Sequence, residues 1–344
     1  MPNIGDVKGL MDELKASTKP KYNLLTGDEL LKLDIPPMIW MSHMLIPHPG
    51  LVAISGQPGA HKTFFAMWLA MRIADGKPLF DESDEAFFAQ ASAPTNPPQA
   101  NVLFIEEENT AQLVKGRYHD LKPMTDGSKI MFLIEEGFKF TDSLWCDEIK
   151  NIIKERSISV VILDSFVSCM GIKNENDNAE IAAVLDVVRH EFVKQGLTVI
   201  FIHHPSKSND GGKNLRGAGD ILGKMDVHLC LTKDEEDKRK VKVSYEKMRV
   251  ADETTVSDFE IRLTGENDLR TLQYRYLGTA KTKKDAMAGK ILEVMKEIPD
   301  GCARDELAEY MSTGKSDGSF RRAWDKLKKD NLIYQSPNKR FYVK

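Results

Sequence analysis

The sequence predicts an α/β fold with a mainly parallel central sheet, followed by a small α+β domain at the C-terminal end. Three observations lead to this expectation. Almost wholly apolar runs lie at residues 51–54, 102–105, 158–163 and 197–202, and such runs are typical of strands buried on both faces of a parallel sheet. Helical patterns separate several of these runs. Beyond about residue 278 the pattern changes to three helices and a hairpin.

The composition is that of an ordinary globular protein, with 29% charged and 41% hydrophobic residues among 344. A net charge of −4 excludes a polycation, so any contact with nucleic acid must come from a local basic face or from loops. The chain has no apolar run of membrane-spanning length and no signal peptide, which predicts a cytoplasmic protein without a membrane partner. Its cysteines form no C-x-x-C pair, so we expect reduced thiols and no zinc site: Cys146, Cys169, Cys230 and Cys302.

The first apolar run opens the stretch LVAISGQPGAHKT, residues 51–63, which reads as strand, phosphate-binding loop and helix start. In the pattern G-x-x-x-x-G-K-[ST], backbone N–H groups surround the phosphates of ATP, the lysine reaches their outer oxygens and the hydroxyl holds Mg²⁺. Gly56, Lys62 and Thr63 fit, whereas His61 replaces the second glycine. A histidine there needs either a negative φ or a left-handed conformation, which it tolerates better than most residues. The predicted nucleotide-binding residues are Gly56, Gln57, Pro58, Gly59, Ala60, His61, Lys62, Thr63 and Phe64.

Acidic residues follow two later apolar runs. The first continues into Glu106, Glu107 and Glu108, and a carboxylate at such a strand end can activate the water that attacks a γ-phosphate. We prefer Glu108 for this role, with Glu107 as the alternative. Asp164 closes the next run and fits an acid that holds Mg²⁺ through water, as in the Walker B motif.

The fourth run ends in His203 and His204, either of which could sense a γ-phosphate, although strand-end histidines often make only structural hydrogen bonds. The Gly-, Ser-, Asn- and Lys-rich stretch that follows is either a solvated loop or a loop that contacts nucleic-acid phosphates through Lys207, Lys213 and Arg216. Two cations further on, Lys247 and Arg249, project to the same side of a strand. They are either exposed surface or a finger that reaches the phosphate of a neighbouring subunit.

The last sixty residues predict a winged helix, from three helices followed by a hairpin. Residues 315–344 hold nine Lys/Arg and three Asp/Glu. This basic segment predicts DNA contacts by Arg321, Arg322 and Lys326, with protein docking as the alternative. The expected domains are an N-terminal arm at 1–35, an ATPase domain at 36–277, a linker at 278–285 and the winged helix at 286–344.

The succession GQPGAHKT, VLFIEEEN, VVILDS and VIFIHHPSK followed by RGAGDILGKMDVHLCL resembles the RecA-like ATPases of the RepA type. These are hexameric replicative helicases of plasmids and phages, grouped with DnaB-like and KaiC-like proteins. The likeness covers about residues 35–275. It implies a RecA-like core in which Lys62 and Thr63 bind ATP and Mg²⁺, Glu108 activates water and Asp164 is the Walker B acid.

The same resemblance implies that His204, or less favourably His203, senses the γ-phosphate, and that residues 205–219 line a ring pore and bind DNA. Lys247 and Arg249 are similar to a finger contributed across a subunit interface. His61 and the C-terminal winged helix depart from the family pattern.

The resulting hypothesis is an ATP-dependent helicase or translocase on single-stranded DNA. It would be a homo-hexamer that replicates a plasmid, phage or mobile element, with a primase or initiator as further partners. The alternatives are a regulatory or recombination-mediator ATPase that does not unwind DNA, and a nucleotide-gated interaction protein.

Overall fold

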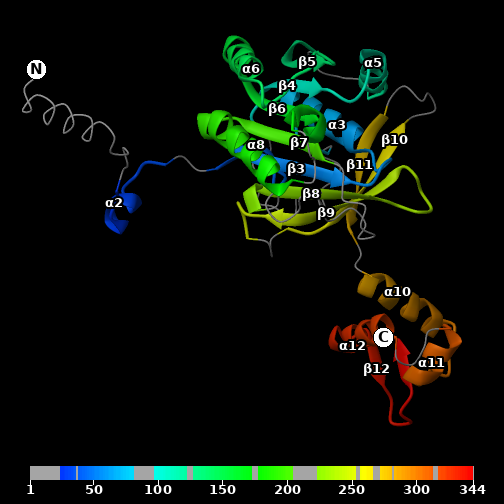
Figure 1. The fold of residues 1–344 in the computed structure, drawn as a ribbon. Coiled ribbons are helices and arrows are strands. Elements are labelled where there is room, and N and C mark those ends of the chain that lie inside the picture. The colour runs from blue at the N-terminus through cyan, green and yellow to red at the C-terminus, as the bar shows by residue number, and fades with distance from the viewer. Residues whose placement is uncertain are drawn as a thin grey trace, which may run out of the picture. The chain divides into compact units, whose positions relative to one another are not determined.

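The computed structural model describes residues 24–35, 38–80, 97–121, 127–172, 177–203, 223–252, 256–265, 272–280, 283–312 and 317–343. Its main feature is a nine-stranded sheet of order β11-β10-β9-β8-β3-β7-β6-β4-β5 (Figure 1). The strands from β8 to β5 in this order run parallel, and β9, β10 and β11 extend the sheet antiparallel. The strands are β3 (Gly50–Gly56), β4 (Asn101–Glu106), β5 (Ile130–Ile134), β6 (Ile158–Asp164), β7 (Thr198–His203), β8 (Val227–Lys233), β9 (Lys240–Met248), β10 (Phe259–Gly265) and β11 (Leu272–Thr279).

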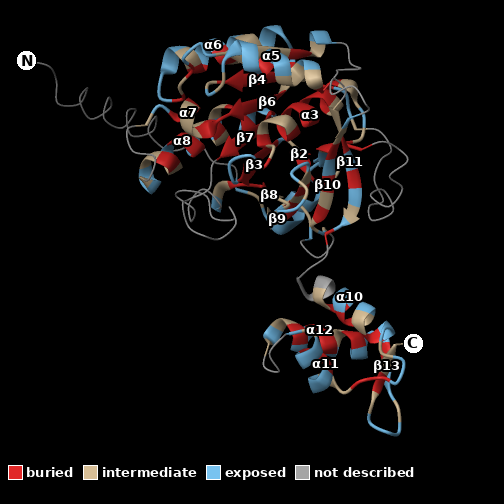
Figure 2. Cartoon of the chain, turned by 90° about the vertical axis from the view of Figure 1, so that its right-hand side faces the viewer, coloured by how far each residue is buried: buried red, intermediate tan, exposed pale blue. Residues whose placement is uncertain are grey.

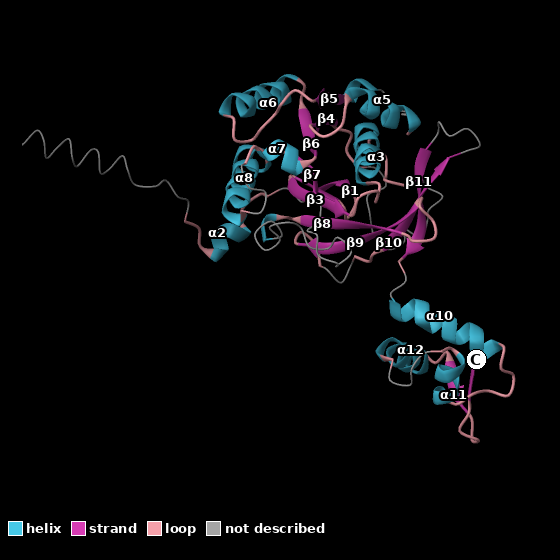
Figure 3. Cartoon of the chain, turned by 45° about the vertical axis from the view of Figure 1, so that its right-hand side comes forward, coloured by secondary structure: helices cyan, strands magenta, loops and turns pink. Residues whose placement is uncertain are grey.

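Helices cover both faces of the parallel part of this sheet (Figure 3). Successive side chains of a strand point to opposite faces. In β3, Val52 and Ile54 therefore join one buried cluster, and Leu51 and Ala53 join another. The first cluster packs under α3 (Lys62–Asp75) and α5 (Ala111–Asp120), and the second under α6 (Ser143–Glu155), α7 (Phe166–Met170) and α8 (Asn178–Glu191). The continuous buried strands between two helical layers (Figure 2) explain why the sequence runs are apolar throughout.

Smaller elements complete this part of the chain: β1 (Ile39–Ser42) pairs antiparallel with β2 (Ile46–His48), and single turns of 3₁₀-helix lie at η1 (Gly127–Lys129) and η2 (Val193–Gln195). The elements α5 and β5 have no counterpart in the sequence-based expectation. The antiparallel pair β10 and β11 lies at one edge of the sheet.

Residues 24–35 contain the short helix α2 (Gly27–Leu31). A reciprocal capping box closes its N-terminus: Glu29 N–H donates to Thr26 Oγ1 at 3.3 Å, and Thr26 N–H donates to Glu29 Oε2 at 2.8 Å. No residue of this helix is buried. The part of the predicted arm at residues 1–23 lies outside the described residues.

The C-terminal elements have a core of their own. They are α10 (Lys283–Lys296), α11 (Arg304–Tyr310), α12 (Gly318–Lys329), β12 (Ile333–Gln335) and β13 (Phe341–Val343), with a bridge between Cys302 and Phe341. Phe320, Trp324 and Leu327 from one face of α12 pack in this core. The three helices and the hairpin agree with the expected elements, while β11 and α10 extend into the predicted linker at 278–285.

None of the helices in the described stretches is long and apolar enough to cross a membrane.

Replacing Leu327 by alanine should destabilise the C-terminal core by about 2–5 kcal/mol, because a buried leucine loses its packing and leaves a cavity. Leu327 is 1% exposed, whereas Leu332 is 45% exposed, so Leu332→Ala is the matched control. Hydrogen exchange followed by mass spectrometry should show faster exchange of α12 peptides in Leu327→Ala only. Equal exchange in the two variants would contradict the assigned core.

Candidate functional site

The loop between β3 and α3 has the backbone conformation that a phosphate site requires. Gly56 has φ 152°, and a Cβ there would lie 2.3 Å from the carbonyl oxygen of Leu231, so only glycine fits. Gly59 has φ 78°. His61 adopts the left-handed conformation, with φ 61° and ψ 23°, which is the second of the two options that the sequence left open. The turn therefore keeps the geometry of the usual glycine with a histidine in its place.

Lys62 starts helix α3 and is buried. Its ammonium donates to the carbonyl oxygens of Gly56 at 2.8 Å and Gln57 at 3.1 Å. Burial lowers the pKa of Lys62, while the negative charges of Asp164 and Glu108 act in the opposite direction. A buried ammonium folded back on its own loop is suited to exchange these carbonyls for phosphate oxygens.

Thr63 and Asp164 join the start of α3 to the end of β6. The Thr63 hydroxyl donates to Asp164 Oδ2 at 2.6 Å. Burial raises the pKa of Asp164, and the bond from Thr63 partly offsets this effect. A hydroxyl and a carboxylate side by side are the oxygen ligands that Mg²⁺ prefers. These two residues therefore fit the metal that accompanies a nucleotide in such loops.

The three glutamates after β4 have different surroundings. Glu106 is buried opposite Asp164 in the sheet register, and its Oε1 accepts from the N–H groups of Glu108 at 3.0 Å and Asn109 at 2.8 Å. Burial and the charge of Asp164 raise the pKa of Glu106 to about 8. Glu107 accepts from the N–H groups of Gly137 and Phe138 at 3.0–3.1 Å.

Glu108 is exposed, and its charge acts on both Lys62 and Asp164. The sequence offered Glu107 and Glu108 as the residue that activates water. Glu107 binds the backbone of Gly137 and Phe138, whereas the charge of Glu108 acts on the phosphate site.

Arg117 of α5 is a residue that no sequence motif marked. Its guanidinium lies 5.9 Å from the ring centre of Phe64, and its positive charge lowers the pKa of Asp164 against the effect of burial. The Nη1 atom of Arg117 is buried and has no hydrogen-bond partner among the described residues. The position becomes visible only once α5 is packed beside the start of α3.

The charged turn between β8 and β9 also lies at this site. The ammonium of Lys233 would lie 3.9 Å from a Cβ at Gly59. Burial lowers the pKa of His61, and the charges of Lys233 and Arg239 lower it further. The loop is therefore flanked by cations and a neutral imidazole, a suitable environment for an anion.

His203 ends β7, is fully buried, and lies next to Ser55 in the register of β3 and β7. His204 and the predicted DNA contacts Lys207, Lys213 and Arg216 lie outside the described residues. In α12, Arg321 and Arg322 are exposed and Lys326 is half-buried.

Lys247 and Arg249 lie away from the phosphate loop of their own chain. Both donate to the carbonyl oxygen of Gly223, Lys247 at 3.0 Å. The N–H of Arg249 donates to the carbonyl of Asp226, whose own N–H donates to Leu51. Arg249 is thus level with Leu51, five positions before Gly56 in β3, which is roughly 16 Å along the strand. Both side chains reach the same carbonyl, but Arg249 lies one residue beyond β9 and so is not part of the expected strand. The pair lies toward the amino ends of the parallel strands, away from Lys62.

The profile of a protein family described as an AAA domain matches residues 16–210, which is more than half of the chain. The chain belongs to this AAA-domain family. The match contains the loop at Gly56–Thr63, the glutamates after β4 and Asp164. Membership and the geometry of the loop agree with a P-loop ATPase, and an AAA domain indicates nucleotide hydrolysis, typically with Mg²⁺.

A buried histidine next to the start of the loop should make the stability of the protein depend on pH. His228 Nε2 lies 2.7 Å from the Oγ of Ser55. Burial, assisted by the charge of Lys247, lowers the pKa of His228 from 6.5 to about 4. Between these values the unfolded chain binds a proton that the folded chain excludes, so stability falls as the pH drops.

From pH 7 to pH 5, His228→Gln should lose about 2 kcal/mol less unfolding free energy than the wild type. Urea unfolding at the two pH values measures this difference, and His119→Gln, at an exposed histidine, is the control. Equal losses in wild type and His228→Gln would show that His228 titrates normally.

Proposed function

We propose that this AAA-domain ATPase is an ATP-dependent helicase or translocase that acts on single-stranded DNA as a homo-hexameric ring, in the replication of a plasmid, phage or mobile element. The observation that supports the proposal most directly is the separation between two sets of residues. One set lies at the carboxyl ends of the parallel strands and consists of Lys62, Thr63, Asp164 and Glu108. The two cations Lys247 and Arg249 lie toward the amino ends of these strands.

Within one subunit, the chain's own residues would divide the work of hydrolysis. Lys62 binds the outer phosphate oxygens, and Thr63 with Asp164 holds Mg²⁺, which neutralises charge on the phosphates when bound. Glu108 orients and deprotonates the attacking water. Glu106 and Glu107 position Glu108 by fixing the turn after β4, one through the amides of Glu108 and Asn109, the other through those of Gly137 and Phe138.

Lys247 and Arg249 would complete the site of a neighbouring subunit. Since Arg249 is level with Leu51, far along the sheet from its own phosphate loop, it would reach a γ-phosphate in another copy of the chain, as a finger supplied in trans does, with Lys247 beside it. An ATPase built this way needs a ring or filament, because each site is shared between two subunits. Their bonds to Gly223 would then be exchanged for phosphate contacts on assembly.

The remaining roles come from the resemblance to RepA-type helicases. His204 would sense the γ-phosphate, and Lys207, Lys213 and Arg216 would contact the backbone of single-stranded DNA in the pore. The C-terminal order of helix, bridge at Cys302, two helices and hairpin supports a winged helix. Arg321, Arg322 and Lys326 of its third helix would bind DNA, and a primase or initiator would be a further partner.

The test is the ATPase rate with and without single-stranded DNA, measured together with the molar mass in the presence of ATP and Mg²⁺. The proposal predicts stimulation by DNA and a mass of about six subunits, followed by unwinding of a forked duplex. Hydrolysis indifferent to DNA from a monomer or dimer would favour a regulatory ATPase instead. DNA stimulation without unwinding would favour a translocase or a recombination mediator.

A second prediction concerns Glu107 and Glu108. Glu108→Gln should slow turnover by about 10²- to 10⁴-fold while ATP still binds, because the amide cannot take the proton of the attacking water. Glu107→Gln is the matched control, since its remaining carbonyl oxygen can still accept from Gly137 or Phe138 and most of the rate should survive. The measurements are single-turnover hydrolysis and binding of a fluorescent ATP analogue. If Glu107→Gln stops turnover and Glu108→Gln does not, the catalytic role belongs to Glu107.

A further inference from the structure

The C-terminal hairpin carries two tyrosines whose rings stack. Tyr334 of β12 and Tyr342 of β13 are direct partners in the antiparallel register. Their ring centres are 5.6 Å apart and their planes differ by 26°. The other aromatic side chains of this core, Phe320, Trp324 and Phe341, are buried, whereas Tyr334 is 45% exposed. Part of the Tyr334 side chain is therefore accessible to solvent.

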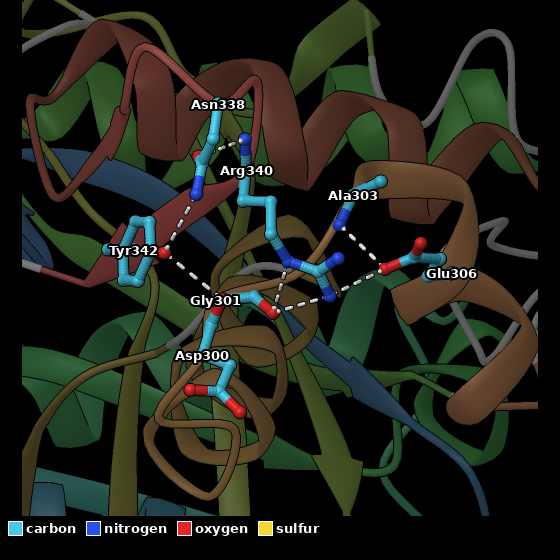
Figure 4. A network of polar contacts seen from close by, with 7 residues as sticks. All are labelled: Asp300, Gly301, Ala303, Glu306, Asn338, Arg340 and Tyr342. Atoms are coloured by element: carbon cyan, nitrogen blue, oxygen red, sulfur yellow. Dashed lines mark hydrogen bonds and ion pairs between the residues drawn. The ribbon is translucent and has the colours of Figure 1, made fainter.

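The inner ring of this stack lies against backbone. Gly301 has φ 67°, and a Cβ at this position would be 2.7 Å from the Cζ atom of Tyr342, so a glycine is needed for the ring to approach so closely. The Tyr342 hydroxyl donates to the carbonyl oxygen of Asp300 at 3.0 Å and accepts from Asn338 Nδ2 at 3.5 Å (Figure 4). Tyr342 is thus held in place at both its face and its hydroxyl.

Arg340 fastens the same backbone to the hairpin. Its Nε and Nη2 donate to the Gly301 carbonyl at 3.0 and 2.9 Å, and Nη2 also pairs with Glu306 at 3.0 Å. Glu306 in turn accepts from the N–H of Ala303 at 3.1 Å (Figure 4). The charge of Arg340 is therefore offset by Glu306, and its guanidinium binds the Gly301 backbone that lies against the ring of Tyr342.

The part of the chain that contains this stack is basic. Residues 317–343 contain seven Lys/Arg and three Asp. The exposed cations among them are Arg321, Arg322, Lys328, Lys329 and Lys339, the last of which lies in the hairpin turn. A rigid aromatic surface together with exposed cations is the combination by which proteins bind unpaired nucleotides, since bases stack on the rings and phosphates pair with the cations.

We propose that Tyr334, supported by Tyr342, is a stacking platform for an unpaired base of single-stranded DNA. This inference rests on the proposed action on DNA, and it adds a contact outside the ring pore and outside α12. Stacking is indifferent to base identity, as a translocating enzyme requires. In this arrangement Arg321 and Arg322 bind phosphates and Tyr334 binds a base.

Fluorescence anisotropy of a labelled oligothymidylate, titrated with the full-length chain, tests the platform. Tyr334→Ala should weaken binding by about 5- to 100-fold, and Tyr334→Phe should bind like the wild type. Tyr334→Leu keeps an apolar contact with Tyr342 but lacks a ring, so it should bind as weakly as Tyr334→Ala. The matched control is Tyr310→Ala, which removes a tyrosine of the same domain that is 65% exposed and should bind normally.

Salt dependence separates stacking from charge. Tyr334→Ala should keep the wild-type slope of affinity against salt, whereas Arg321→Ala should reduce it by about one ion. Photocrosslinking with an oligonucleotide that contains 5-iodouracil should modify Tyr334.

The failures can be told apart. Wild-type affinity in Tyr334→Ala, or recovery in Tyr334→Leu, would overturn the platform alone. No binding of single-stranded DNA by the wild type would overturn the proposed function as well.

Discussion

The hydrogen bond from Thr63 to Asp164 is the interaction on which the site depends. It joins the first turn of α3 to the carboxyl end of β6, and so fixes the phosphate loop against the middle of the sheet. Because β6 pairs in register with β4, Asp164 lies beside Glu106, and the turn that follows places Glu108 near Lys62. A parallel sheet brings the ends of its strands to one edge, so a single contact there positions residues that are far apart in sequence.

Two buried acids lie side by side at the carboxyl ends of β4 and β6, and their pKa values show that their ionised forms are disfavoured there. Burial raises the pKa of both Glu106 and Asp164, and their mutual repulsion strengthens the effect on Glu106. Lys62 and Arg117 supply the opposing positive charge at Asp164. A Mg²⁺ ion would add positive charge beside these acids, and phosphate oxygens would accept hydrogen bonds from the buried ammonium of Lys62. The charges at the site are therefore better balanced with Mg²⁺ and a nucleotide bound than without them.

The sequence was sufficient where a local pattern determines the structure. Continuous apolar runs indicated the buried parallel strands β3, β4, β6 and β7, and a loop motif located Lys62 and Thr63. It was insufficient where tertiary packing decides. Which of three adjacent glutamates faces the lysine depends on the amides of Gly137 and Phe138, thirty residues later in the chain. Arg117 enters the site only because α5 packs beside α3, and no periodicity signals that contact.

The trans arrangement of Lys247 and Arg249 is the central claim about assembly. The most direct test mixes two variants, Lys62→Ala and Arg249→Ala, and measures the ATPase rate of the mixture. Each variant alone should be nearly inactive, since every site lacks either the phosphate lysine or the finger. In a randomly mixed ring, roughly a quarter of the interfaces pair an intact loop with an intact Arg249, so activity should return to about that fraction. No recovery in rings shown to contain both variants, or full activity of Arg249→Ala alone, would contradict the shared site.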